Sequence, residues 1–331
     1  MWVWGEFILA SALIIISGSY LARVGDKIGE VMGWERTWVG LILLSFSTAL
    51  PELFTSVSSA GILHQPDLSL GNNLGSITFN LFLIAILDFL SKEPLTRGLD
   101  PSLALSGSFL ILFIFLYLFF LTLPLNRGIL GVGGDTIFIF LFYFIALRMI
   151  FIHQHRNNEE VEKREREKGI WKFWLYYFIL GGLILIGGLW LAKTGEKISR
   201  ITGLSRTFVG TLFLAVVTSL PELSTTIASL KMGLPNMAVG NILGANLQNL
   251  VIPFFSDAFY RGGYLLSEIS SSNIFTLILA GILTVILLLG MIYRSRRAFL
   301  RMGWDSLLIF LLYIWGMFIL FSMGEAVSLI N

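Results

Sequence analysis

Two short phrases, each present twice, decide how this chain folds. The first copy reads STALPEL over Ser47–Leu53 and then GNNLGSITFN over Gly71–Asn80. The second copy reads VTSLPEL over Val217–Leu223 and then GNILGANLQN over Gly240–Asn249. Each copy places a glutamate directly after a proline in one apolar stretch and an asparagine in the next. A carboxylate in hydrocarbon is costly and usually marks function, so the phrases predict a symmetric cation site inside a membrane.

The composition is that of a polytopic membrane protein. Of the 331 residues, 56% are hydrophobic and 13% are charged, and the mean hydropathy is +0.81. The absence of cysteine excludes disulfides, thiolate metal sites and cysteine nucleophiles. The basic residues form no nucleic-acid-binding pattern. No basic residue precedes the first apolar run, so we expect a permanent span rather than a cleaved signal peptide.

Ten apolar windows are long enough to cross the hydrocarbon as helices. They cover residues 6–24, 37–61, 68–90, 99–123, 129–152, 170–193, 206–231, 236–257, 273–293 and 304–328. The sequence therefore predicts an all-α membrane protein of ten transmembrane helices. Residues 1–152 form the first five-helix repeat, 153–169 a charged linker and 170–331 the second repeat.

The two halves of the chain correspond position by position. Glu52 and Glu222 lie 170 positions apart, and Asn80 and Asn249 lie 169 positions apart. Because five spans is an odd number, the second half enters the membrane from the opposite side, which predicts inverted-topology repeats. About 17 of the 23 Lys and Arg residues lie at loops that follow odd-numbered spans. The positive-inside rule then predicts a multi-pass cell-membrane protein with both termini outside and the linker in the cytoplasm.

The two proline–glutamate pairs supply the chemistry of the predicted site. Pro51 and Pro221 cannot donate a backbone hydrogen bond, so carbonyls of the preceding turn are released beside Glu52 and Glu222. Inside a membrane these carbonyls need water, protein or a cation as a partner. The plainer interpretation of each glutamate is a protonated or paired carboxyl that only packs helices.

Other oxygen-bearing side chains accompany the two glutamates. They are Thr48, Thr218, Ser76, Ser219, Asn80 and Asn249. Each alone could simply link or pack helices, but their positions beside the duplicated breaks favour donation of oxygen to a cation. Asp88 and Asp257 follow the two asparagines by eight residues, and could either attract cations at the two mouths or lie at the interface without a role.

The charge of the predicted site indicates which ions it accepts. Two carboxylates at one depth repel each other, so in the absence of a metal ion they should take up protons. A divalent cation neutralises both, and an irregular oxygen shell suits Ca²⁺ better than Mg²⁺. The lack of thiolate and imidazole argues against zinc, copper and nickel. Two Na⁺ or two H⁺ would neutralise the same pair, and such mutually exclusive binding is what antiport requires.

With these motifs the chain resembles the calcium/cation antiporter superfamily, and within it the sodium/calcium exchangers. The resemblance covers both halves and implies a central four-helix ion site, across which the first and sixth spans slide to alternate access. It implies that Ca²⁺ binds to Glu52 and Glu222 and to the backbone oxygens of Thr48 and Thr218. The side chains that it implies for flanking cation sites are Ser76, Ser219 and Asn80.

Three positions depart from the usual exchanger pattern, and two more resemble another branch of the superfamily. Ala49 and Ala245 stand where serine is common, and Asn249 is an amide where some relatives carry aspartate. Ile77 and Gln248 resemble the proton-coupled calcium exchangers. The leading prediction is therefore Ca²⁺/Na⁺ antiport, and proton-coupled exchange on the same fold is the alternative. A passive cation channel is less favoured, because inverted repeats more often mean alternating access.

Several other classes find no support in the sequence. A histidine-rich metal motif, a cysteine nucleophile and a nucleotide-binding loop are all lacking, so we expect a transporter rather than an enzyme. No cofactor is expected besides the transported ions. The expected partners are Ca²⁺, Na⁺ or H⁺ and the lipid bilayer, with no nucleic acid and no obligate protein partner.

Overall fold

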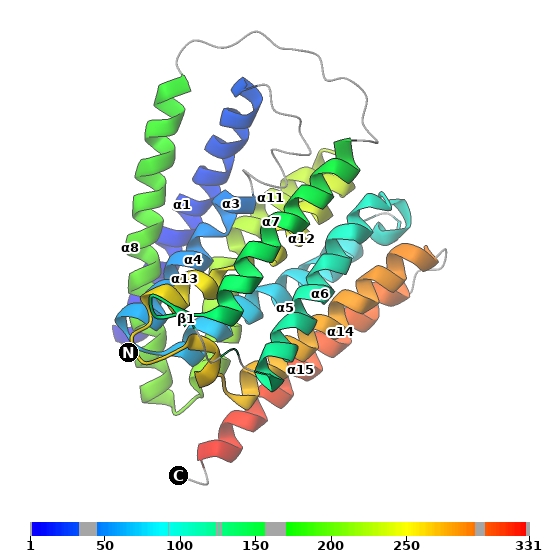
Figure 1. Ribbon diagram of the computed structural model, residues 1–331. Coiled ribbons are helices and arrows are strands. Elements are labelled where there is room, and N and C mark those ends of the chain that lie inside the picture. Colours follow the sequence, from blue (N-terminus) through cyan, green and yellow to red (C-terminus); the bar gives the residue numbers. More distant parts are fainter. Residues whose placement is uncertain are drawn as a thin grey trace.

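The computed structural model describes residues 2–32, 45–91, 93–123, 125, 128–155, 170–294 and 302–328. Almost all of this part of the chain is helical, as the apolar windows predict, because a backbone in hydrocarbon must satisfy its own hydrogen bonds. The long helices run beside one another in one bundle, and both chain ends lie toward its lower side in Figure 1. A chain whose two ends lie on the same side of a membrane must cross that membrane an even number of times.

The elements follow the predicted order of helices, except for one two-stranded hairpin that was not predicted. In the first half they are α1 (Trp2–Met32), α3 (Ser45–Thr48), α4 (Leu50–Val57), the π-helical turn η2 (Ser58–Ile62), α5 (Pro66–Leu90), the 3₁₀ turn η3 (Leu95–Gly98), α6 (Ser102–Thr122), β1 (Gly128–Ile129), β2 (Val132–Gly133) and α7 (Gly134–His155). In the second half they are α8 (Ile170–Thr202), α9 (Arg206–Phe208), the π-helical turn η4 (Val209–Leu214), α10 (Ala215–Thr218), α11 (Leu220–Lys231), α12 (Pro235–Asn249), α13 (Ile252–Phe259), the 3₁₀ turn η5 (Leu265–Glu268), α14 (Ser271–Tyr293) and α15 (Trp304–Ser328).

Eight of the described helical segments are long and apolar enough to cross a membrane, and the bent pair 206–218 and 220–231 makes a ninth span if counted as one. The chain is thus a multi-pass, nearly all-helical membrane protein. The predicted span 37–61 is described only from residue 45, and its first part lies outside the described residues. The count of ten spans therefore stays a prediction.

Three predicted windows have boundaries that differ by several residues from the helices. The first and sixth windows end at 24 and 193, whereas α1 ends at Met32 and α8 ends at Thr202. The fifth window was expected to begin at residue 129, but α7 begins at Gly134. The preceding residues form a hairpin in which Ile129 pairs with Val132. Leu130 and Gly131 at its tip have φ angles of 55° and 85°, the left-handed pair that a two-residue hairpin turn requires.

Two helical segments form the centre of the bundle. In their most apolar stretches, 78% of α5 and 83% of α12–α13 is buried, compared with 22% of α7 and 33% of α15. Close packing depends on glycine here. A methyl group added at Gly75 would lie 2.5 Å from the Cα atom of Thr211, so α5 approaches the π-helical turn η4 backbone to backbone. The central helices are those that carry the asparagine phrases.

Helices α1 and α8 lie side by side along one edge of the bundle (Figure 1). Each contacts the glutamate-bearing helix of the other half, α1 with α11 and α8 with α4. Glycines permit both crossings. An added methyl group would lie 2.5 Å from Pro221 Cγ at Gly18, and 3.0 Å from the Thr55 amide nitrogen at Gly188.

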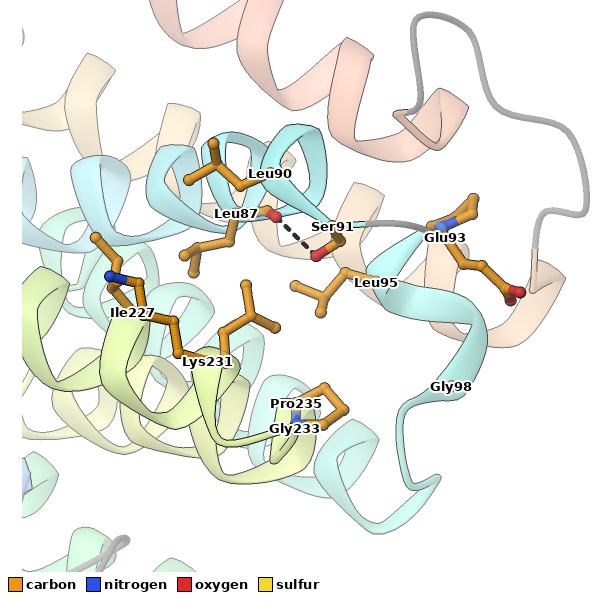
Figure 2. A pocket seen from close by; sticks show the side chains of 12 residues that line it. Leu87, Leu90, Ser91, Glu93, Leu95, Gly98, Ile227, Lys231, Gly233 and Pro235 are labelled. Carbon is orange, nitrogen blue, oxygen red and sulfur yellow. Dashed lines mark hydrogen bonds between the residues drawn. The ribbon is translucent and has the colours of Figure 1, made fainter.

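Asp257 has a structural role rather than the suggested one at an ion entrance. Its Oδ2 atom accepts hydrogen bonds from the Gly133 amide and from Thr136 Oγ1, both at 2.7 Å, and its Oδ1 atom accepts one from the Leu265 amide at 2.6 Å. It therefore joins the turn after α13 to the start of α7. Asp88 makes the equivalent link, because it accepts hydrogen bonds from the amide of Leu95 in the turn after α5 (Figure 2) and from the amide of Gly303 just before α15.

Candidate cation site

Each glutamate lies just after a break in its span. Helix α3 ends at Thr48 and α4 begins at Leu50, while α10 ends at Thr218 and α11 begins at Leu220. The proline near the start of each new helix has no N–H to donate to the preceding turn, so the helix cannot continue unbroken. In the second half the two segments meet at 44°. Both glutamates thus occupy the first turn of a helix, where the helix dipole favours negative charge.

Glu52 is held by hydroxyl groups from two other elements. Its Oε1 atom accepts hydrogen bonds from Ser219 Oγ at 3.0 Å and from Ser76 Oγ at 3.4 Å. Ser76 Oγ also lies 3.5 Å from Thr218 Oγ1. The carboxylate is fully buried, yet its Oε2 atom has no hydrogen-bond partner among the described residues. Four of the predicted site residues therefore form one bonded group with a spare carboxylate oxygen.

Glu222 has the same position in the second half but different surroundings. It is fully buried, and neither of its carboxylate oxygens is hydrogen-bonded within the described part of the chain. Thr48 lies beside it, and Glu52 is close enough to repel it. Two unneutralised carboxylates in a buried site cost several kcal/mol, because their hydration is lost without compensation. The pair is therefore suited to bind positive charge.

The two predicted asparagines also differ. Asn80 Nδ2 donates to Asn246 Oδ1 at 2.9 Å, and Asn246 Nδ2 donates to the Ile77 carbonyl at 3.4 Å. Asn80 thus ties α5 to α12. Asn249 is fully buried, but within the residues described neither end of its amide has a partner. The structure therefore places Asn80 in a hydrogen-bonded link and leaves Asn249 outside the group around Glu52.

The donor set consists of oxygen atoms. All the predicted site residues are fully buried, namely Glu52, Glu222, Thr48, Thr218, Asn80, Asn249, Ser76 and Ser219. Among the described residues there is no group of three or more His, Cys, Asp or Glu side chains that could hold a metal ion. Hydroxyl, amide and backbone oxygens must therefore complete any shell around the two carboxylates, which is the mixture that a hard cation such as Ca²⁺ accepts.

Asn72 belongs to the site, although the sequence reasoning did not single it out. Its Nδ2 atom donates to the Glu52 carbonyl oxygen at 3.4 Å and to Ser56 Oγ at 2.9 Å, and its Oδ1 atom accepts from Thr218 Oγ1 at 3.3 Å. A signal was available, because Asn241 stands 169 positions later and also follows a glycine. Asn241 makes the equivalent link in the second half, to two threonine hydroxyls of α11 at 3.0 and 3.3 Å.

The profile of the family described as "Sodium/calcium exchanger protein" matches residues 2–151 and 172–322, which is most of the chain. The chain belongs to this family. The resemblance inferred from the repeated phrases is thus confirmed, and the protein is a membrane transporter rather than an enzyme.

One relative and two solved structures that are similar to this chain are named as exchangers. The sodium/calcium exchanger MaX1 of Methanosarcina acetivorans is 31% identical over 123 residues, which is 37% of this chain and 31% of that protein. The solved structure of the sodium-calcium exchanger NCX_Mj shares the fold with a TM-score of 0.61 and 21% identity, over 95% of this chain and 97% of that one. The H⁺/Ca²⁺ exchanger CAX shares it with a TM-score of 0.68 and 15% identity, over 99% and 86%.

Proposed function

We propose that this exchanger-family protein is a secondary antiporter that exchanges Ca²⁺ for Na⁺ by alternating access, with the ions bound between Glu52 and Glu222. The observation that carries the proposal is the pair of fully buried carboxylates, one from each half, of which three oxygens have no partner among the described residues. One of these oxygens belongs to Glu52 and two belong to Glu222. A dehydrated Ca²⁺ neutralises both carboxylates and provides the missing partner.

Neutral oxygens complete the proposed shell. Thr48 and Thr218 are the last residues before the two helix breaks and contribute backbone oxygens. Ser76 and Ser219 already approach Glu52, and Asn80 and Asn249 each have a buried carbonyl oxygen with no partner in the described part of the protein. In exchange for Ca²⁺, Na⁺ ions occupy the same oxygen-lined space, so the two ions cannot bind together.

We further propose that ten spans form two inverted repeats, residues 1–152 and 170–331, joined by a cytoplasmic linker at 153–169, with both termini outside the cell membrane. The chain has no cysteine, so a single introduced cysteine is its only thiol. Labelling of that thiol then shows on which side of the membrane the position lies. In intact cells an impermeant thiol reagent should label Ser267→Cys, an exposed position in the turn η5 before α14, and should label Glu160→Cys in the linker only after permeabilisation. The reverse pattern contradicts this topology.

Proton coupling is the second candidate, and particular residues favour it. Ala49 and Ala245 remove hydroxyl groups that flanking Na⁺ sites would use. A proton needs fewer ligands than Na⁺. The loss of these hydroxyls should therefore weaken Na⁺ binding more than proton binding, which favours H⁺/Ca²⁺ exchange.

A gradient-exchange experiment separates these candidates. Proteoliposomes that contain a Ca²⁺ indicator are loaded with Na⁺ and diluted into Na⁺-free buffer at equal pH, and a second set receives a pH gradient without Na⁺. Uptake driven by Na⁺ supports the first proposal, and uptake driven only by the pH gradient supports the second. Ca²⁺ flux that needs neither counter-ion contradicts both and indicates a channel.

A further inference from the structure

A second pair of buried carboxylates lies at the end of the bundle, far along α5 from the glutamates. Asp88 stands near the end of α5 and Asp305 in the first turn of α15, and they are 1% and 9% exposed. Asp88 accepts hydrogen bonds from the Leu95 amide and, at 2.7 Å, from the Gly303 amide. A methyl group added at Gly303 would lie 2.4 Å from Asp305 Oδ1 and 3.6 Å from Asp88 Oδ2. The two carboxylates therefore border one small space.

Three side chains around this space have polar atoms without partners. Neither carboxylate oxygen of Asp305 is hydrogen-bonded within the described residues, and the same holds for the hydroxyls of Thr96 and Ser306. Thr96 faces the Asp305 carboxylate and is 1% exposed, and Ser306 is fully buried. Buried polar atoms normally have a partner, so four such oxygens in one place indicate a ligand that the protein itself does not supply.

The place related to it by the repeat, where the two halves exchange roles, shows that the fold does not require these spare oxygens. There Asp257 and Asp135 correspond to Asp88 and Asp305, and Thr136 corresponds to Ser306. Thr136 Oγ1 donates to Asp257 Oδ2 at 2.7 Å, and Asp135 Oδ1 accepts from the Thr136 amide at 2.7 Å.

The position of Thr96 differs further between the repeats. Its counterpart is Leu266, which is buried and apolar. At both places one aspartate, Asp88 or Asp257, accepts two backbone amide hydrogen bonds, whereas buried oxygens without a partner among the described residues occur only around Asp305.

We infer that Asp88, Asp305, Thr96 and Ser306 form a second binding site for a hard divalent cation such as Ca²⁺, separate from the glutamate pair. The two carboxylates neutralise its charge, the two hydroxyls add neutral oxygens, and water at the end of the bundle completes the six to eight oxygen ligands that Ca²⁺ accepts. Thiolate and imidazole are missing from these four side chains, so softer transition metals are disfavoured. This site does not depend on which ion drives exchange.

Calcium binding to the purified full-length protein tests the inference. The measurement uses the Glu52→Gln/Glu222→Gln double variant, so that the central carboxylates do not contribute, and isothermal titration with Ca²⁺ alone. We expect one remaining site. Asp305→Asn should weaken it by about tenfold or more, because it removes a charged ligand, and Thr96→Val should weaken it by roughly threefold.

Asp135→Asn is the matched control, because it changes the equivalent aspartate of the other repeat and keeps an acceptor oxygen for the Thr136 amide. It should leave Ca²⁺ binding unchanged. If Asp305→Asn does not fold, as judged by thermal unfolding without Ca²⁺, Thr96→Val decides alone. The inference is overturned if the double variant binds no Ca²⁺. It is also overturned if the Asp305 and Thr96 substitutions leave the Ca²⁺ affinity of the double variant unchanged.

Discussion

Glu52 and Glu222 occupy equivalent positions in the two repeats, yet only one of them is held by the protein. Glu52 accepts hydrogen bonds from Ser219 and Ser76, whereas both oxygens of Glu222 are without partners in the described part of the chain. The cause lies in the sequence. Ser219 follows the threonine of the second phrase, and its counterpart in the first phrase is Ala49. The repeats therefore duplicate the charges of the site but not the hydroxyls that orient them.

The largest effect should appear in the Ca²⁺-free protein. Glu222→Gln removes an uncompensated buried carboxylate and should raise the free energy of unfolding by about 1–3 kcal/mol. Glu52→Gln keeps an oxygen that can accept from Ser219, so the free energy of unfolding should change by less than about 1 kcal/mol. Thermal unfolding of both variants without Ca²⁺ measures the difference. Equal shifts would mean that the two carboxylates have equivalent surroundings after all.

Helices α1 and α8, which pack against the two glutamate-bearing helices, should also differ in how well they tolerate alanine in place of glycine. An added methyl group at Gly18 meets Pro221 at 2.5 Å, whereas at Gly188 the closest contact is 3.0 Å. Gly18→Ala should destabilise the protein by about 1–3 kcal/mol and slow exchange, and Gly188→Ala should do so less. Gly5→Ala is the control, because nothing lies within 4 Å of its added methyl group. A Gly18→Ala protein as stable and active as the Gly5→Ala protein would refute this close crossing.

The hydroxyl contributed by the second repeat should matter for Ca²⁺ affinity. Ser219→Ala removes the 3.0 Å hydrogen bond that orients Glu52. A loss of about 1–1.5 kcal/mol corresponds to roughly tenfold weaker Ca²⁺ activation of exchange. Ser224→Ala, an exposed serine on the same helix, should have no effect. Equal Ca²⁺ dependence in both variants would show that Ser219 does not orient the site.

The smallest effect should come from restoring the symmetry. Ala49→Ser places a hydroxyl at the position equivalent to Ser219 and should let it donate to Glu222. We expect about threefold stronger activation of exchange by Na⁺, in line with a hydrogen bond of about 0.5–1 kcal/mol. Initial rates across a Na⁺ series, compared with Ala49→Val, measure the change. A decrease in both variants would indicate that this position has no room for a ligand.

Much of this arrangement is readable from the sequence, because it follows from local chemistry. A carboxylate next to proline within an apolar window is unusual enough to reveal the helix break and the site. The pairing of Asn80 with Asn246, rather than with its counterpart Asn249, depends on how α5 and α12 pack. The link made by Asn72 likewise joins the two halves, and no local pattern specifies it. Contacts across the repeats are therefore the part that the sequence leaves undetermined.

The central claim is that Ca²⁺ is transported between Glu52 and Glu222. Its most direct test is Ca²⁺ uptake into proteoliposomes under the gradient that drives the parent protein, with Glu52→Gln, Glu222→Gln and, as control, Glu93→Gln at an exposed carboxylate that pairs with Arg97. We predict that each of the first two substitutions abolishes uptake and that the control retains it. Uptake at the parent rate by both glutamine variants of the buried pair would contradict the claim.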